Sequence, residues 1–307
     1  MIILSGGTGT PKLLNGLKRI IQEDAITVIV NTAEDFWLSG NFVCPDIDTV
    51  LYTFADLIDK SKWWGIKNDT FKTYEFLKNL GYTEKLQIGD LDRAIHILRS
   101  ELIRNGFTLT QATSEIAKKF KIKAKILPMS NNEISTIINT KNGEMHFQDF
   151  WIAHKGEPEV IGVEFKGIME PSSEVISALE SEKDVIIGPS NPITSIGPIL
   201  KLKGIKKLLK QKNVIAISPI IGHQPVSGPA GKLMHACGYE VSSSGVIECY
   251  KEFLDTFIID VRDDLLLGPI YEKNINILSA DTRMTSVEKS ISLAKFVVDI
   301  LTCKKVK

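Results

Sequence analysis

A glycine-rich segment near the start of the chain has the residue types of a phosphate-binding loop. It has the sequence Ser5-Gly6-Gly7-Thr8-Gly9-Thr10 and lies between a short apolar run and a helical pattern. Glycine lets the backbone approach a ligand closely, and the start of a helix offers free N–H groups and a positive dipole end. Lys12, in the first helical turn, adds a positive charge. The segment predicts an anion site, and a tight turn without a ligand is the alternative.

Two aspartates separated by one residue stand ahead of another helical pattern. They are Asp46 and Asp48 in the segment Cys44-Pro45-Asp46-Ile47-Asp48-Thr49. Magnesium in proteins is often held by one or two carboxylates together with phosphate oxygens of the substrate. We therefore expect Mg²⁺ at Asp46 and Asp48. Capping of the helix by one of the aspartates is the alternative, and the two roles can coexist.

Polar residues also follow several predicted strands. In doubly wound sheets, ligands bind beyond the carboxyl ends of the strands, so these residues are expected to line one crevice. For the first group, a turn without a ligand is the alternative. The residues are Asn31 and Asp35 after the second strand, Ser190, Asn191, Ser195 and Gly197 in a proline-rich loop, and Ser218 and Gly222 in a later loop.

The elements that must position these residues alternate between strand and helix. An apolar run at 2–4, the glycine loop, a helical pattern from Lys12 to Ile21 and a β-branched run at 26–30 predict a βαβ unit. Such a unit has a right-handed connection and parallel strands. Alternation resumes near the C-terminus and predicts an α/β fold with a mostly parallel sheet. Further strands are expected at 184–187, 213–217, 257–259 and 275–278, and a final helix at 286–301.

The middle of the chain is mainly helical. Apolar stripes at helical spacing occur between residues 49 and 122, without a strong strand pattern, and predict a helical insertion. The α/β domain is then expected to comprise residues 1–48 and 123–307. A strand at 123–127 is followed by alternating segments at 134–140 and 144–150 around Lys141-Asn142-Gly143, which predict a hairpin.

Composition excludes several classes of protein. The 307 residues contain 37 Lys plus Arg and 37 Asp plus Glu, and this balance argues against nucleic-acid binding through a broad basic face. The four cysteines form no CxxC pair, which is typical of free thiols in a reducing cytoplasm. No signal-peptide pattern and no run of roughly 20 apolar residues is present, so a cytoplasmic protein without a membrane partner is expected.

Seven motifs together resemble the 2-phospho-L-lactate transferase family of coenzyme F420 biosynthesis, in its archaeal form. They follow the family's order and span nearly the whole chain, which makes the set far more specific than any one motif. The motifs are Leu4-Ser5-Gly6-Gly7-Thr8-Gly9, Asn31-Thr32-Ala33-Glu34-Asp35-Phe36, Pro45-Asp46-Ile47-Asp48-Thr49, Ile88-Gly89-Asp90-Leu91-Asp92, Leu127-Pro128-Met129-Ser130, Gly188-Pro189-Ser190-Asn191-Pro192 and Ser218-Pro219-Ile220-Ile221-Gly222.

The resemblance implies a fold and a reaction. The fold is Rossmann-like, with helices on both faces of the sheet, and the protein is a homodimer. The reaction moves a 2-phospholactyl group from lactyl-2-diphospho-5′-guanosine to a ribityl hydroxyl of the deazaflavin Fo, requires Mg²⁺, and yields F420-0 and GMP. Transfer at phosphorus needs positioning and charge neutralisation, which agrees with the absence of a nucleophilic triad in the sequence.

The resemblance also assigns roles to residues. Asp46 and Asp48 bind the metal or orient the Fo hydroxyl, with Asp48 the stronger candidate. Fo is expected at Gly7, Thr8, Asn31, Asp35, Asp48 and Gln87, and the guanosine diphosphate at Gly9, Lys12, Ser190, Asn191, Ser195, Gly197, Ser218 and Gly222. Relatives often have a basic residue where this chain has Gln87, and Lys12 or Lys232 is the candidate to compensate.

Two other functions share parts of this pattern. A related group of bacterial regulators, the gluconeogenesis-factor type, has the same Gly-Gly-Thr-Gly opening and binds a nucleotide-sugar without turnover. The βαβ opening alone also suggests a nicotinamide oxidoreductase, but Lys12 replaces the third glycine of its fingerprint and the second strand ends in Asn31. The paired aspartates favour the transferase over the regulator.

Overall fold

A seven-stranded parallel sheet forms the centre of the molecule. The computed structural model describes residues 1–226, 228–263 and 275–303. The strand order is β14-β13-β10-β9-β1-β2-β5, and each neighbouring pair is parallel. The strands are β1 (Ile2–Ser5), β2 (Thr27–Val30), β5 (Lys125–Pro128), β9 (Asp184–Ile187), β10 (Asn213–Ile217), β13 (Thr256–Asp260) and β14 (Asn276–Ala280). The predicted α/β fold is confirmed.

The order of the strands reverses between β1 and β9. From β1 the chain proceeds outward to β2 and β5, and from β9 it proceeds the other way to β10, β13 and β14. A crevice opens at such a switch point, beyond the carboxyl ends of the two central strands. The glycine loop after β1 and the proline-rich loop after β9 therefore lie next to each other.

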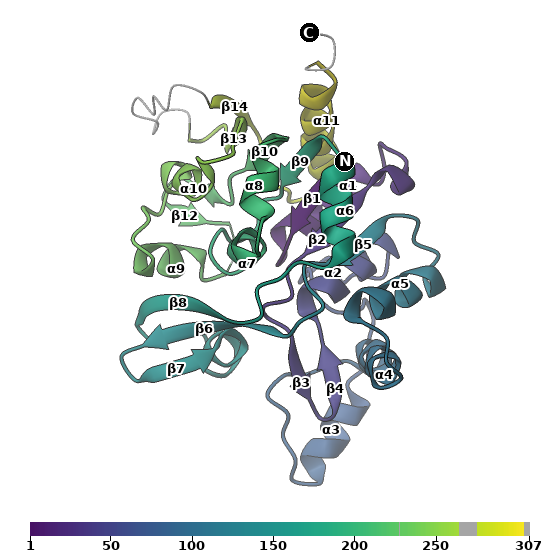
Figure 1. Ribbon diagram of the computed structural model, residues 1–307. Coiled ribbons are helices and arrows are strands. Elements are labelled where there is room, and N and C mark those ends of the chain that lie inside the picture. The colour runs from purple at the N-terminus through teal and green to yellow at the C-terminus, as the bar shows by residue number, and fades with distance from the viewer. Residues whose placement is uncertain (227, 264–274, 304–307) are drawn as a thin grey trace.

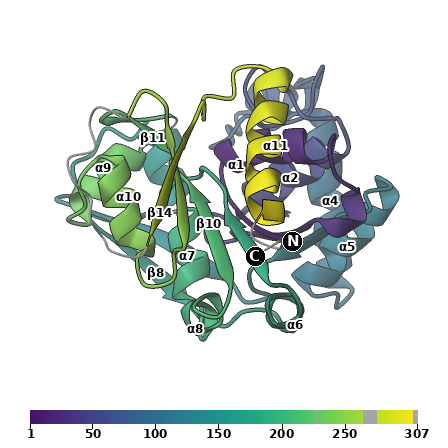
Figure 2. The ribbon, with the colours of Figure 1, turned by 90° about the horizontal axis from the view of Figure 1, so that it is seen from above.

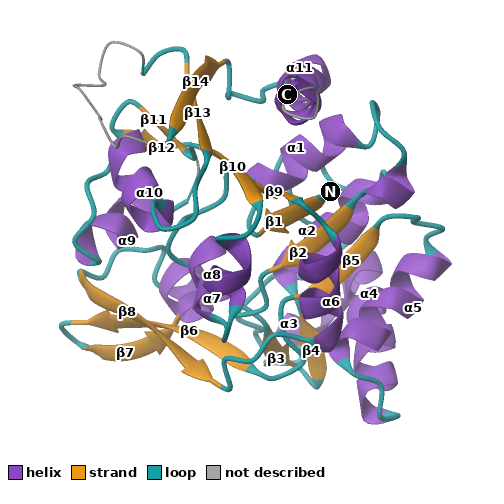
Figure 3. Cartoon of the chain, turned by 45° about the horizontal axis from the view of Figure 1, so that its top comes forward, coloured by secondary structure: helices purple, strands orange, loops and turns teal. Residues whose placement is uncertain are grey.

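Alternate residues of each strand face two hydrophobic cores, because successive side chains in a strand point to opposite faces. Leu4 belongs to one core and Ile3 to the other, and both are fully buried. Helices consequently cover both faces of the sheet (Figures 2 and 3). The first core is covered by α6 (Ser173–Ser181), α7 (Ile196–Lys201), α8 (Ile205–Leu209), α9 (Ala230–Ala236) and α10 (Ser243–Tyr250), and the second by α1 (Gly9–Leu17), α2 (Pro45–Phe54), α5 (Leu109–Lys119) and α11 (Val287–Cys303).

Four helices occupy the predicted helical segment. They are α2, α3 (Lys72–Asn79), α4 (Asp90–Arg104) and α5, and the described chain has no strand between α2 and β5. Val50 of α2 and Ile116 of α5 share a core with Ile3 and Val28 of the sheet. Helices α2 and α5 pack on the sheet in the same core as α1 and α11. The boundaries of a separate insertion at 49–122 therefore stay a prediction.

Two small antiparallel sheets extend from the same end of the main body (Figure 1). One is a hairpin of β3 (Phe36–Leu38) and β4 (Asn41–Val43), and the other has the order β7-β6-β8. Its strands are β6 (Ile134–Thr140), β7 (Gly143–His146) and β8 (Val160–Gly167). The sequence interpretation missed β3, β4 and β8. A further hairpin joins β11 (Ile220–Ile221) to β12 (Gln224–Pro225).

Several predicted boundaries move by a few residues. The hairpin around Gly143 is confirmed, but its second strand ends at His146 rather than 150, because Phe147 and Phe150 turn into the core. A π-helical turn, η2 (Asp149–Ala153), and a 3₁₀ turn, η1 (Glu23–Ala25), complete the elements. Helix α1 begins at Gly9 and ends at Leu17, so Gly9 and Lys12 are helical residues. No helix in the described ranges is both long and apolar enough to cross a membrane.

Candidate functional site

Asp46 holds the glycine loop at the switch point. Its Oδ1 accepts a hydrogen bond from the backbone N–H of Gly7 at 2.8 Å, and its Oδ2 accepts one from Asn31 Nδ2 at 3.0 Å. A methyl group on Gly6 would lie 2.6 Å from Cβ of Ser195, so that glycine permits the close approach of the proline-rich loop. The glycine loop, Asn31, Asp46 and the proline-rich loop are far apart in the sequence, and the structure brings them together.

The carboxyl group of Asp46 lies in an environment that disfavours its charge. Only 5% of the residue is exposed, and burial raises its pKa to about 6, although the hydrogen bonds from Asn31 and Gly7 oppose this shift. Burial and the neighbouring Asp46 also raise the pKa of Glu34 well above its ordinary value. Neither carboxyl group makes an ion pair within the described chain. A cation beside Asp46 would therefore relieve the cost of burying this charge.

Asp48 faces a different environment, although only one residue separates it from Asp46. Arg99 of α4 donates to Asp48 Oδ2 at 3.0 Å and also to Oδ1, and His96 Nε2 lies 3.1 Å from Oδ2. Burial alone would raise the pKa of Asp48, but Arg99 and His96 outweigh it and lower the pKa to about 2. Both aspartates belong to helix α2, where residues i and i+2 do not face each other, and they have different partners, so a metal shared by Asp46 and Asp48 stays a prediction.

His96 links Asp48 to a second aspartate. Its Nε2 is 3.2 Å from Asp92 Oδ1, which also accepts the hydroxyl of Tyr52 at 2.6 Å. Burial would lower the pKa of His96, but the two aspartates raise it to about 9. Asp48, Asp92 and His96 have the spacing of a metal site, yet His96 and Arg99 already neutralise the two carboxylates. The helical spacing of Asp92, His96 and Arg99 was the signal in the sequence for this polar face.

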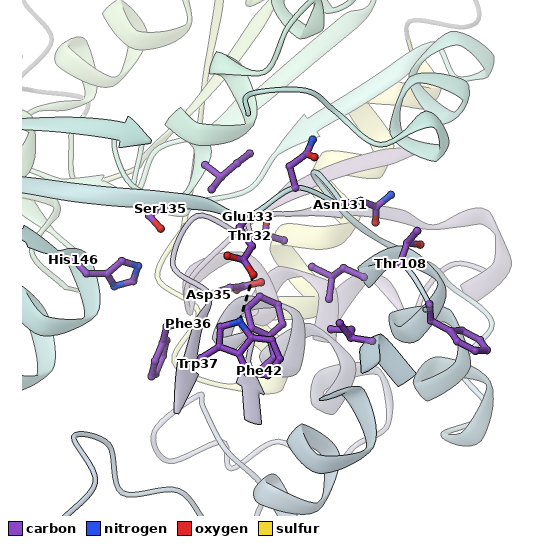
Figure 4. Close-up of a pocket in the computed structure, with 15 residues that line it drawn as sticks. Thr32, Asp35, Phe36, Trp37, Phe42, Thr108, Asn131, Glu133, Ser135 and His146 are labelled. Carbon is purple, nitrogen blue, oxygen red and sulfur yellow. Dashed lines mark hydrogen bonds between the residues drawn. The ribbon is translucent and has the colours of Figure 1, made fainter. Parts of the chain in front are cut away.

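A cavity of about 300 Å³ opens beyond β2, and we call it the aromatic pocket (Figure 4). Phe36, Trp37, Phe42 and Phe107 supply its rings. Its polar lining includes Thr32, Asp35 and His146; among the described residues Thr32 Oγ1 and His146 Nε2 are buried without a hydrogen-bond partner, and the buried Asp35 carboxyl has the Cys44 thiol beside it. Burial raises the pKa of Asp35 well above its ordinary value and lowers the pKa of His146. A flat ring with polar groups on its edge fits such a lining.

A second cavity, of about 220 Å³, opens beyond β9 and β10, and we call it the cationic pocket. Lys12 and Arg283 line it together with Gly9 at the start of α1. Within the described ranges neither cation forms an ion pair, and burial lowers the pKa of Lys12. Two cations without a carboxylate partner among the described residues, together with a helix N-terminus, favour an anion such as a diphosphate. The sequence interpretation missed Arg283, which follows β14 at the same edge of the sheet.

Several predicted ligand-binding side chains instead hold the loops together. Ser190 bonds to Thr10 Oγ1 at 2.7 Å and to the carbonyl of Gly6, and Asn191 Oδ1 accepts the N–H of Ile193. Ser195 and Gly197 belong to the close packing of the same loop, and neither lines a pocket described above. Lys232 donates to the carbonyls of residues 156, 157 and 158, so it is committed to that loop.

The remaining predicted residues divide between the pockets and their surroundings. Ser218 lines the cationic pocket, and its hydroxyl donates to the carbonyl of Ile220. The N–H of Gly222 donates to Asp263. Thr8 is the N-cap of α1, and Gln87 is exposed and lines neither pocket. Asp35 alone of the residues expected to bind Fo lines the aromatic pocket, and the assigned roles stay predictions.

Comparison with known proteins places the chain among archaeal enzymes. Residues 1–296 match the model of the family described as 2-phospho-L-lactate transferase CofD. The 2-phospho-L-lactate transferase of Methanosarcina acetivorans is 58% identical over 302 residues, which cover 98% of each chain. The protein of that name from Methanocaldococcus jannaschii is 45% identical and covers 97% of this chain and 96% of its own.

A solved structure shows the same fold at low sequence identity. A member of the UPF0052 family from Bacillus halodurans aligns with a TM-score of 0.67 at 18% identity, over 97% of each chain. The names of the curated relatives favour the enzymatic interpretation over the nucleotide-sugar-binding regulator. From the family match and these identities, the chain belongs to the 2-phospho-L-lactate transferase family.

Proposed function

We propose that this protein transfers the 2-phospholactyl group of lactyl-2-diphospho-5′-guanosine to Fo, giving F420-0 and GMP. The observation that carries the proposal is a pair of pockets of opposite chemistry at one edge of the sheet. The aromatic pocket suits the planar deazaflavin ring of Fo, and the cationic pocket suits the diphosphate of the donor. Gly7 and Asn31 belong to loops at this same edge, and Asp46 in the first turn of α2 accepts a hydrogen bond from each of them.

The chemistry requires one bond to form and one to break at phosphorus. The ribityl oxygen of Fo bonds to the phosphorus that carries lactate, the bond from that phosphorus to the GMP oxygen breaks, and the hydroxyl proton must leave. With a pKa of about 6, Asp46 is largely ionised at neutral pH, so it can accept this proton when no cation is bound to it, or hold a cation while the proton passes to solvent. Lys12 and Arg283 would stabilise the charge that develops on GMP.

The residues fit a magnesium ion better at Asp46 than at Asp48. Asp46 is a buried carboxylate without a cationic partner in the described chain, whereas Arg99 and His96 neutralise Asp48. Asp46 would hold the ion together with phosphate oxygens of the donor. When bound, Mg²⁺ would neutralise charge on the transferred phosphoryl group. A homodimer and a cytoplasmic location are further expectations of the family resemblance.

A single assay tests the proposed function. The purified protein is incubated with Fo, the guanylated donor and Mg²⁺, and F420-0 and GMP are measured by mass spectrometry. Omitting Fo is the matched control, because hydrolysis of the donor would release GMP without F420-0. Failure to form F420-0 while Fo and GDP both bind would contradict the transferase assignment.

Asp46→Asn and Asp48→Asn then test the two aspartates. Loss of one catalytic contact usually lowers kcat by about 10² or more. We expect Asp46→Asn to reach this range, because it lies among the motifs at the switch point. Turnover of Asp48→Asn within about tenfold of wild type would contradict a role for Asp48 in the reaction.

A further inference from the structure

One face of helix α4 connects the first turn of α2 with the wall of the aromatic pocket. We infer that Arg99 and Ser100 are positioning residues, which hold Asp48 and the strand β4 in a fixed relation so that the acceptor ring can bind. Neither residue lines the aromatic pocket, so each acts through the groups it binds. The inference rests on the proposed function, in which the aromatic pocket takes the ring of Fo.

Arg99 bonds to two elements with one guanidinium group. Its Nη1 donates to Asp48 Oδ2 at 3.0 Å and to the carbonyl oxygen of Phe42 at 3.3 Å, and its Nη2 donates to Asp48 Oδ1. The side chain is completely buried. A planar fork can bind both carboxylate oxygens and still direct an N–H toward a carbonyl, which the single ammonium of lysine cannot reproduce.

Ser100 binds the other polar group of the same β4 residue. The N–H of Phe42 donates to Ser100 Oγ at 2.7 Å, and that hydroxyl donates to the carbonyl of His96 at 2.6 Å. Phe42 therefore has both backbone groups attached to consecutive residues of α4. In the β3–β4 register Phe42 lies opposite Trp37. Alternate residues of an antiparallel pair direct their N–H and carbonyl groups away from the partner strand, and those of Phe42 face the helix.

These attachments lead directly to the pocket wall. The rings of Phe42 and Trp37 both line the aromatic pocket, with their centroids 5.1 Å apart. Strands β3 and β4 have three residues each, and an isolated two-stranded hairpin is marginal at best in water. The position of the two rings consequently depends on the contacts that hold the hairpin on α4. Arg99 makes one of these contacts and also binds Asp48.

The test compares acceptor binding with donor binding in three variants of the full chain. Arg99→Lys keeps the charge but loses the fork, and Ser100→Ala removes the bonds of the hydroxyl to the Phe42 N–H and to the His96 carbonyl. Lys18→Met is the matched control, because Lys18 is also a buried cation and donates to the carbonyls of Thr53 and Phe54 at the far end of α2. Fo binding is measured by its fluorescence, GDP binding by calorimetry, and folding by circular dichroism and thermal melting.

We expect the dissociation constant and the KM for Fo to rise about tenfold or more in Arg99→Lys and about fivefold in Ser100→Ala. GDP affinity and the KM for the donor should stay within about twofold of wild type, and Lys18→Met should lower the melting temperature without changing Fo binding. This selectivity would support positioning, since a general loss of stability would affect both ligands.

Three results would overturn the inference. They are wild-type affinity for Fo in both Arg99→Lys and Ser100→Ala, an equal loss of Fo and GDP binding, or the same loss of Fo binding in Lys18→Met. If Arg99→Lys does not fold, Ser100→Ala decides the matter alone by the same criteria. Failure of the wild-type protein to bind Fo would instead contradict the proposed function, so the two failures are distinguishable.

Discussion

At the level of single residues, Asp46 and Asp48 show how strongly the surroundings of a carboxyl group decide its chemistry. Asp46 accepts two neutral N–H donors and has a raised pKa, whereas Asp48 pairs with Arg99 and His96 and has a lowered one. The first is suited to exchange a proton or bind a cation near neutral pH. The second is a permanent anion within a buried charge network.

The pKa of Asp46 predicts the pH dependence of turnover. Because its pKa is raised to about 6, the carboxylate form is lost as the pH falls through 6. With Mg²⁺ below saturation, so that a bound ion does not lower this pKa, we expect kcat/KM to decrease below about pH 6 in the wild type and this decrease to be absent in Asp46→Asn. Steady-state rates between pH 5 and pH 8, with protein integrity checked by circular dichroism, measure it. A wild-type profile that is flat through pH 6 would contradict the role of Asp46.

The raised pKa of His96 predicts how the free energy of unfolding depends on pH. Its pKa rises from 6.5 in the unfolded chain to about 9 in the folded protein, so its contribution is fully present below pH 6.5 and is lost as pH rises through 9. The difference corresponds to about 3 kcal/mol at most. Urea unfolding between pH 6 and pH 9.5 should show this decline in the wild type but not in His96→Gln.

His235→Gln is the control for that experiment, because His235 lies exposed on α9. The stability of His235→Gln should decline with rising pH in the same way as that of the wild type. If His96→Gln and wild type show the same decline between pH 6.5 and pH 9, the charged pairing of His96 with Asp48 and Asp92 is wrong.

At the level of elements, the first turn of α1 depends on a close approach that only glycine permits. A methyl group on Gly9 would overlap with the carbonyl oxygen of Pro189, in the loop after β9. The same two residues line the cationic pocket. The contact between helix and loop therefore shapes the predicted donor site.

We expect Gly9→Ala to separate α1 from that loop, with a loss of about 1–3 kcal/mol in the free energy of unfolding and a weaker affinity for GDP. Gly162→Ala is a matched control, since its new methyl group would lie 3.7 Å from Asn139, an ordinary contact distance. Urea unfolding and GDP calorimetry measure both effects. Equal behaviour of the two variants would show that the close approach at Gly9 has no energetic importance.

The loop after β14 carries a further prediction, because Arg283 faces the cationic pocket without a carboxylate partner in the described chain. Removing a charged hydrogen bond to phosphate usually costs about 1.5–3 kcal/mol, so Arg283→Ala should raise the dissociation constant for GDP about tenfold or more. Lys118→Ala, on the exposed side of α5, should leave it unchanged. An unchanged GDP affinity in Arg283→Ala would exclude contact with the diphosphate.

At the level of the whole molecule, the seven strands belong to both hydrophobic cores. Helices α2, α4 and α5 share the second core with α1 and α11, so unfolding either part would expose the same sheet face. We expect one cooperative transition in urea. Far-ultraviolet circular dichroism and tryptophan fluorescence should coincide, with Trp63 and Trp64 reporting on segment 49–122 and Trp37 and Trp151 on the rest. Two separate transitions would support an independently folding insertion.

The sequence by itself determined the features that depend on neighbouring residues. Continuous β-branched runs predicted buried parallel strands, and Ser5 to Thr10 predicted a glycine loop ahead of a helix, since a strand period and a tight turn are local properties of the chain. The order of the motifs identified the family, which the comparisons confirm. Helix boundaries were less accurate, because Gly9 and Thr10 enter α1 through their packing against the loop after β9.

Only the tertiary structure decided which polar groups of the described chain are paired within the protein. The partners of Asp48 are His96 and Arg99, about 50 residues away, and no local pattern shows that their charges are already balanced. The Ser190 hydroxyl bonds to Thr10 and to the carbonyl of Gly6, and Asn191 Oδ1 accepts an N–H of its own loop, whereas Arg283 has no ion-pair partner in the described chain and lines a pocket. Types and spacing of residues set the available chemistry, but the pairing of charges across the fold selects which groups remain available for the substrates.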